Sequence, residues 1–127
     1  MNAIIENLLT RRSTRAFLQR EIPDNELNEI LQAAIYAPSG MGKQTWKFTV
    51  LCNQEKIQQL AELIGRKLGR KGYDMYRPQV LIIPSNQKEN PHGMEDNACA
   101  LENIFLAAHS FGIGSVWINQ LRTLCDL

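Results

Sequence analysis

The segment from Gly93 to Phe111 constrains the fold more strongly than any other part of this chain of 127 residues. Glu95 and Asp96 favour the start of a helix here, and Gly112 favours its end. Apolar residues occupy nearly every side of this helix, namely Ala98, Ala100, Leu101, Ile104, Phe105, Leu106, Ala107 and Ala108. A helix that is apolar all round is normally buried. We therefore expect the rest of the chain, together with a partner chain, to pack around it.

Length and composition indicate one domain. A chain of 127 residues can bury a hydrophobic core but is too short for two ordinary domains, so we expect residues 1–127 to form a single globular domain. The formal net charge of +1 gives no overall attraction to nucleic acid or anionic lipid. Any anion-binding site must therefore be local.

The cysteines and the N-terminus bear on the compartment. Cys52, Cys99 and Cys125 are odd in number and widely spaced, which indicates neither a disulfide framework nor a metal site. The N-terminus lacks the pattern of a secretory signal, and no apolar run approaches the roughly 20 residues that span a bilayer. We expect a cytoplasmic protein without a membrane partner.

Apolar residues recur at helical spacing in three further segments, which are 2–10, 24–37 and 54–68. Asn2 and Asp24 are good N-cap residues for the first two helices. The second helix must end before Pro38, because the residue before a proline avoids helical backbone. Residues 121–127 have the pattern of a helix that has barely begun.

Runs rich in β-branched and apolar residues predict three strands, at 48–52, 80–83 and 115–118. The run at 80–83 is the clearest, because Pro78 precedes it and Pro84 follows it, and we expect it to be central and buried. The alternation of helices and strands would by itself predict a parallel α/β sheet.

A cluster of cations and hydroxyls, Arg11-Arg12-Ser13-Thr14-Arg15, directly follows the first predicted helix. The planar guanidinium fork matches phosphate bidentately, and a hydroxyl adds a short donor beside it. Cations near a helix C-terminus are also favoured by the helix dipole and are often simply solvated. On the residues alone, a phosphate clamp and a solvated surface both remain open.

Two loops can each be interpreted as functional or as purely structural. The loop at 37–46 is rich in glycine and hydrogen-bonding residues, so it is either a functional loop or a plain connection from helix to strand. The basic segment at 65–72 is either a helix end with a mobile loop or a lid near an anionic substrate.

The usual catalytic side chains are not evident. His92 lies in a loop and His109 in an apolar helix, and the helix start accounts for Glu95 and Asp96. The sequence contains no Gly-x-Ser-x-Gly, His-Glu-x-x-His or Walker loop. An anion clamp without a proton-transfer group points to a cofactor that carries its own reactivity.

Four segments, at 11–15, 37–48, 96–108 and 111–118, together resemble the FMN-dependent nitroreductase family, and their order and spacing match as well. The resemblance implies an α+β fold, with a mixed β-sheet flanked by helices and completed by homodimerisation. It covers nearly the whole chain.

The resemblance also implies a site. The first segment would bind the FMN phosphate and ribityl chain through Arg11, Arg12, Ser13 and Arg15. The second would reach the flavin of the partner subunit through Pro38, Ser39, Gly40, Gly42 and Gln44. The last would pass the isoalloxazine ring with Trp117, Ile118, Asn119 and Gln120.

The activity implied is that of an FMN oxidoreductase, in which NADH or NADPH reduces the flavin and a nitroaromatic or quinone accepts the hydride. The flavin carries the chemistry, so no catalytic side chain is needed. The alternative is a flavin-binding protein with weak activity or none. A nucleic-acid module is disfavoured by the net charge of +1 and by the lack of aromatics interleaved with basic residues.

The chain departs from the family in two ways. Gly42 stands where relatives usually carry Asn, which removes an amide near the flavin, and Thr45 stands where they carry Pro. Relatives also continue past this length into a C-terminal strand or arm that supplies another basic phosphate ligand. We therefore expect a C-terminally shortened relative, or part of a longer chain.

Overall fold

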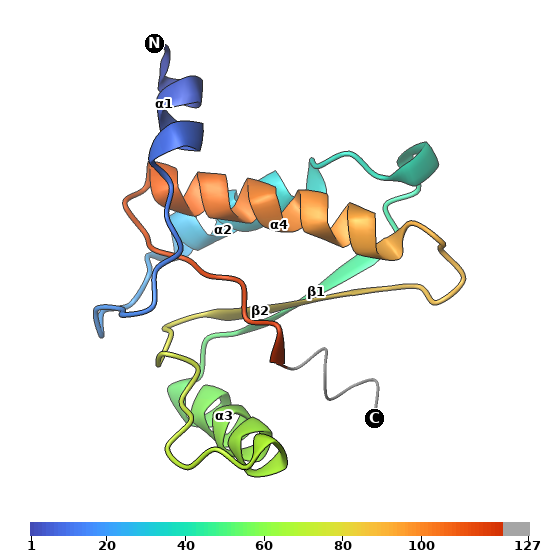
Figure 1. Cartoon of the computed structure of the whole chain (residues 1–127). Helices are drawn as coiled ribbons and strands as arrows, with labels where there is room; N and C mark the ends of the chain where they lie inside the picture. The colour runs from blue at the N-terminus through green and yellow to red at the C-terminus, as the bar shows by residue number, and fades with distance from the viewer. Residues whose placement is uncertain (121–127) are drawn as a thin grey trace.

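The computed structural model describes residues 1–120. In chain order its elements are α1 (Ala3–Thr10), α2 (Asp24–Ile35), the 3-10 helix η1 (Gly40–Gly42), β1 (Trp46–Leu51), α3 (Gln54–Leu68), β2 (Leu81–Asn86) and α4 (Gly93–Ser110). Helices α2 and α4 pack on one side of the β1–β2 pair, and α3 lies on the other (Figure 1). The helix start predicted at 121–127 lies outside the described residues.

The sheet of the described chain is an antiparallel pair. Strands β1 and β2 run from Trp46 opposite Asn86 to Leu51 opposite Leu81. The parallel sheet suggested by the alternation of elements is therefore wrong for this pair. The connection through α3 returns β2 alongside β1 in the opposite direction.

Two strand predictions need correction. Pro84 does not end β2 but lies within it, opposite Phe48, and the strand is half-buried rather than fully buried. Proline is tolerated at a sheet edge, where its missing N–H faces away from the neighbouring strand. In the described chain the segment predicted as a strand at 115–118 forms only one parallel bridge, from Ser115 to Ser13, because its other residues find no strand partner.

The larger core lies between α2 and α4. Ala100, Ile104 and Ala108 recur every fourth residue on α4, and this row packs against Ile30 and Ala34 of α2. Because three of these five side chains are alanines, the two helices approach closely. None of the helices between residues 1 and 120 combines the length and apolarity needed to cross a membrane.

The smaller core lies under α3, on the other side of the sheet. Ile57, Ala61 and Ile64 form the buried face of the helix and enclose Met75. The helix ends at Gly69, whose φ of 69° is a left-handed conformation that glycine adopts without penalty. The periodicity of residues 54–68 thus predicts both the helix and its buried face.

Helix α1 projects away from both cores (Figure 1). Asn2 caps it as predicted, accepting a hydrogen bond from Ile5 N at 2.9 Å. None of the residues of α1 is buried in the described chain, and Ile4 and Leu9 are 73% and 60% exposed. The predicted cap at Asp24 is wrong by one residue. Pro23 occupies the N-cap of α2, and Asp24 begins the helix, where its charge favours the helix dipole.

Candidate functional site

Helix α4 separates the two halves of the site predicted from the sequence. Near its start, Asp96 Oδ1 accepts a hydrogen bond from Gly40 N at 2.9 Å. Near its end, His109 Nε2 lies 2.9 Å from Thr10 Oγ1, beside the arginine cluster. A helix rises 1.5 Å per residue, so the interval from 96 to 109 spans roughly 20 Å. Within one chain, the arginine cluster and the loop at 38–44 therefore lie at opposite ends of α4.

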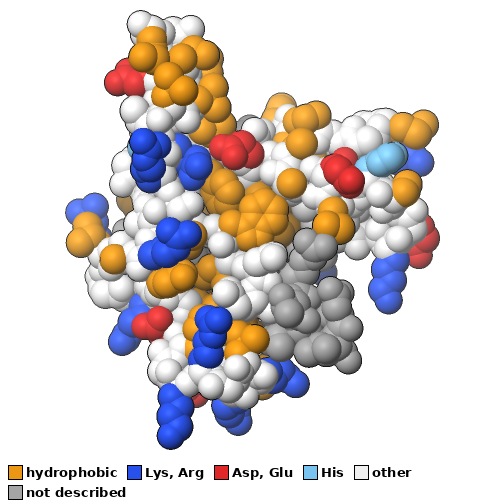
Figure 2. All heavy atoms as spheres, in the orientation of Figure 1, with side chains coloured by type: hydrophobic (Ala, Val, Ile, Leu, Met, Phe, Trp, Pro, Cys, Tyr) orange, Lys and Arg blue, Asp and Glu red, His pale blue; other side chains and the backbone are white. Residues whose placement is uncertain are grey.

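A cavity of about 1410 Å³ lies between α4, β2 and the segment that follows α4. Arg11, Arg12 and Thr14, which are neighbours in the sequence, form a polar part of its lining, and Arg20, Glu21, Glu26 and Glu95 line it as well. Its remaining wall is largely apolar, formed by residues such as Leu101, Ile104, Phe105, Ile82 and Ile118. Figure 2 shows apolar side chains in the middle of this face, with Lys and Arg side chains along one side. The cavity thus combines charged residues with a largely apolar wall.

Arg11 is held in place by α4. Its Nε lies 3.8 Å from Glu102 Oε1, and its guanidinium carbon lies 6.0 Å from the centroid of the Phe105 ring. Residues three apart share one face of a helix, so Glu102 and Phe105 contact the arginine side chain together. Arg12 instead folds back, donating from Nη1 to the carbonyls of Leu9 and Arg11 at 3.3 and 3.0 Å. Both arginines line the cavity.

The arginine cluster divides at Thr14. Arg12 and Thr14 line the cavity, whereas Ser13 and Arg15 are exposed and do not. Alternate side chains of an extended segment point to opposite sides, which accounts for this division. Thr14 N donates to Ser115 O at 2.9 Å and ties the cluster to the segment after α4. The sequence reasoning missed Thr14 as a lining residue, although the alternation was visible.

The segment after α4 forms part of the cavity wall. Trp117, Ile118 and Asn119 line the cavity, and the Trp117 ring lies 6.4 Å from that of Phe105. Gln120 is oriented differently, because its Oε1 accepts a hydrogen bond from the Tyr73 hydroxyl at 3.3 Å. Burial is the main cause that raises the pKa of Tyr73, so the hydroxyl keeps its proton and donates.

The loop at 38–44 lies outside the cavity. Ser39 organises it, accepting from Gln44 N at its Oγ and from Gly42 N at its carbonyl, at 3.1 and 2.9 Å. Met41 and Gln44 have φ values of 55° and 50°, a region that residues other than glycine rarely adopt. Met41 is 89% exposed. The loop is thus a turn with a defined backbone conformation, and its outer surface is exposed to solvent.

Some lining residues were not predicted from the sequence. Phe105, Ile104 and Leu101 belong to the helix that was expected to be buried by the core and a partner, and β2 supplies the opposite wall. The breadth of the apolar surface of α4 was the available signal, because it exceeds what packing against α2 needs. The polar residues between 86 and 97, described below, show no sequence pattern from which a site could have been predicted.

Comparison with known proteins decides the family. The Nitroreductase family model matches residues 8–74 and 66–123. The chain belongs to the nitroreductase family. Among solved nitroreductases, a structure with bound FMN from Bacteroides fragilis NCTC 9343 is 43% identical, with a TM-score of 0.94 over 99% of this chain and 74% of that one. The resemblance and the α+β fold class that it implied are therefore confirmed.

Curated relatives agree with the family. A Methanothermobacter thermautotrophicus protein named "Putative NADH dehydrogenase/NAD(P)H nitroreductase" is 33% identical over 90% of this nitroreductase-family chain. An NADPH-flavin oxidoreductase from Vibrio harveyi is 29% identical over 96% of it. The matches cover 59% and 55% of these two relatives, so the chain spans little more than half of their lengths.

Proposed function

We propose that this chain is an FMN-dependent oxidoreductase that passes hydride from NADH or NADPH, through FMN, to a nitroaromatic or quinone acceptor. The observation that carries the proposal is the cavity, whose lining brings Arg11, Arg12 and Thr14 together with a largely apolar wall. Pockets of roughly 300–1,000 Å³ hold small ligands, so this one has room for a flat ring with an anionic tail. The B. fragilis structure with bound FMN supports the same ligand.

The phosphate end of the ligand would lie against Arg11 and Arg12. Arg11 is already seated between Glu102 and Phe105, so little side-chain freedom is lost when it binds an anion. The hydroxyl of Thr14 lines the same part of the cavity. Ser13 and Arg15 stay predictions, as outer members of the clamp.

The ring would lie against Trp117, Ile118 and Asn119 of the cavity wall. Bound FMN would supply the hydride chemistry, accepting two electrons from the nicotinamide and passing them on. The chain itself has to hold the phosphate, orient the ring and keep the site dry. None of these tasks requires a nucleophilic side chain. Gln120 stays a prediction for this segment.

We propose further that the active form is a homodimer. The loop residues Pro38, Ser39, Gly40, Gly42 and Gln44 lie at the far end of α4 from the arginine cluster. A second copy could bring its own loop to the ring held by the first. The uncovered apolar side chains of α1, such as Ile4 and Leu9, provide a surface for that copy. We assign residues 1–127 to one domain of this dimer.

An FMN and riboflavin titration tests the function. Arg11→Ala should weaken FMN binding by roughly tenfold to a hundredfold, because charge-assisted bonds to the phosphate are lost. Riboflavin has no phosphate, so its affinity should stay unchanged. Arg66→Ala, at an exposed position of α3, is the matched control.

Turnover is tested with the same protein. Oxidation of NADH or NADPH should depend on added FMN and on a nitroaromatic or quinone. Equal FMN binding by wild type and Arg11→Ala would contradict the proposed site. Bound FMN without NAD(P)H oxidation would instead support the non-catalytic alternative.

A further inference from the structure

A polar cluster lies at the start of α4, and one of its members, Asn97, also lines the cavity. Its side chains come from three separate segments of the chain, and they are Thr45, Asn86, Asn90, Asp96 and Asn97. Asp96 is 5% exposed, and both of its oxygens accept hydrogen bonds. Oδ1 accepts from Gly40 N at 2.9 Å, and Oδ2 accepts from Asn90 Nδ2 at 3.0 Å. The first turn of the helix also favours a negative charge here.

Backbone N–H groups fix the orientation of both asparagine amides. Asn90 Oδ1 accepts from His92 N at 2.9 Å, so its Nδ2 must face Asp96 and the Thr45 hydroxyl. Asn86 Oδ1 likewise accepts from Gln87 N at 2.9 Å. Neither amide can flip without placing two donors against each other. Asp96 therefore accepts a hydrogen bond at each of its two oxygens.

The cluster holds the loop at both ends. Gly40 is bound by Asp96, and Thr45 is bound at the other end by Asn86 and Asn90, at 2.6 and 2.9 Å. Between these anchors the backbone adopts the positive φ values of Met41 and Gln44, which L residues rarely adopt. The buried side of the loop is thus fixed, and its outer side remains exposed.

We propose that Asp96 is a positioning residue for the flavin site. It fixes the loop at 40–44 in the shape that reaches the flavin ring, and it acts through Gly40 without touching the cofactor. This inference rests on the proposed function, in which that loop contacts the ring. A ring contact affects FMN and riboflavin alike, whereas a phosphate contact affects FMN alone.

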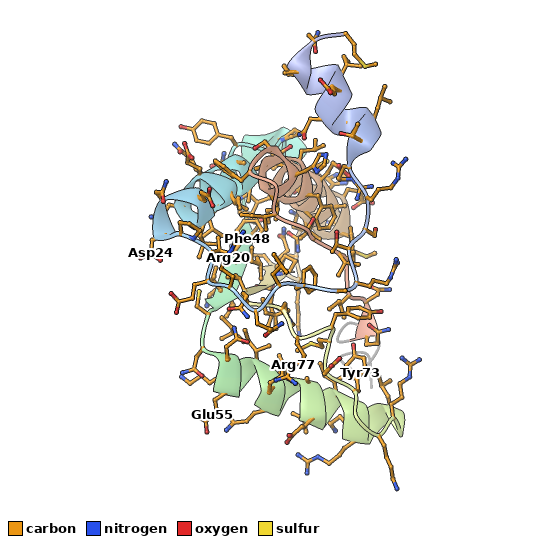
Figure 3. The ribbon with its side chains drawn as sticks, turned by 90° about the vertical axis from the view of Figure 1, so that its left-hand side faces the viewer. Arg20, Asp24, Phe48, Glu55, Tyr73 and Arg77 are labelled. Carbon is orange, nitrogen blue, oxygen red and sulfur yellow. The ribbon has the colours of Figure 1, made fainter. Side chains whose placement is uncertain are left out.

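The test compares Asp96→Asn with wild type by titration of FMN and of riboflavin. In this variant the amide oxygen can still accept from Gly40 N. The amide nitrogen is a donor that faces another donor, Asn90 Nδ2, so the hydrogen bonding that holds the loop weakens. Both affinities should fall by the same factor, about tenfold. Asp24→Asn is the matched control, because it makes the same change in the first turn of α2, where the side chain is exposed (Figure 3).

A second variant separates positioning of the loop from general loss of structure. Thr45→Val tests the other anchor and should also lower both affinities, which keeps the test decisive if Asp96→Asn does not fold. Wild-type affinities in a folded Asp96→Asn would overturn the inference. Failure of wild type to bind either ligand would instead overturn the proposed function.

Discussion

Asp96, Glu102 and Phe105 show how single residues of α4 organise the segments beside it. Arg11 is seated on Glu102 and Phe105 near the end of the helix, and Asp96 binds Gly40 near its start. Ordering a free arginine costs up to about 2 kcal/mol of side-chain entropy, and the contacts of Arg11 with Glu102 and Phe105 lower that cost. The same rigid helix therefore prepares both the clamp and the loop.

At Gly114 a single substitution tests how the arginine cluster packs against the segment after α4. A Cβ there would come within 2.7 Å of the Thr14 Oγ1 and Cγ2 atoms. Because Thr14 is tied to Ser115, Gly114→Ala should destabilise the protein by roughly 1–3 kcal/mol, measured by urea unfolding. Gly40→Ala is the control, since its Cβ would meet the exposed His92 ring at 3.1 Å, which can move aside. Equal stability of wild type and Gly114→Ala would contradict this packing.

At the scale of elements, local pattern predicted the helices and the positions of two strands, but not how the strands pair. The four-residue recurrence in α3 and α4 is contained within each helix, so sequence alone gives its position and buried face. Strand pairing depends on distant segments. The apolar run at 115–118 has strand composition, yet only Ser115 pairs in the described chain, and Pro84 lies within β2 because its N–H is not needed there.

Helix α1 carries the element-scale prediction. Its exposed apolar side chains should lie in the interface of the proposed homodimer, where a charge would be costly to bury. Leu9→Glu should therefore convert the dimer to monomer, measured by sedimentation velocity at micromolar concentration. Leu63→Glu places the same charge on an exposed position of α3 and should leave the dimer intact. A monomeric wild type, or a dimeric Leu9→Glu, would contradict this role for α1.

At the scale of the whole molecule, the candidate site could be predicted only in part. The arginine cluster and the segment at 117–119 reach the cavity, because each is a compact motif at a helix boundary. The polar cluster around Asp96 could not be foreseen, since its partners come from three segments with no shared spacing. The proposal that the loop at 38–44 serves a second copy comes from the resemblance and not from composition.

Mixing two defective chains tests that arrangement in full. If each site takes its clamp from one copy and its loop from the other, Arg11→Ala and Asp96→Asn complement each other. A mixed dimer then has one intact site, formed by the Asp96→Asn clamp and the Arg11→Ala loop. With random assortment, half of the dimers are mixed, so about a quarter of all sites should regain wild-type FMN affinity. The mixture is unfolded and refolded together before titration, and each variant refolded alone is the control. If the loop served its own chain, every site would carry one defect and the mixture would show no recovery.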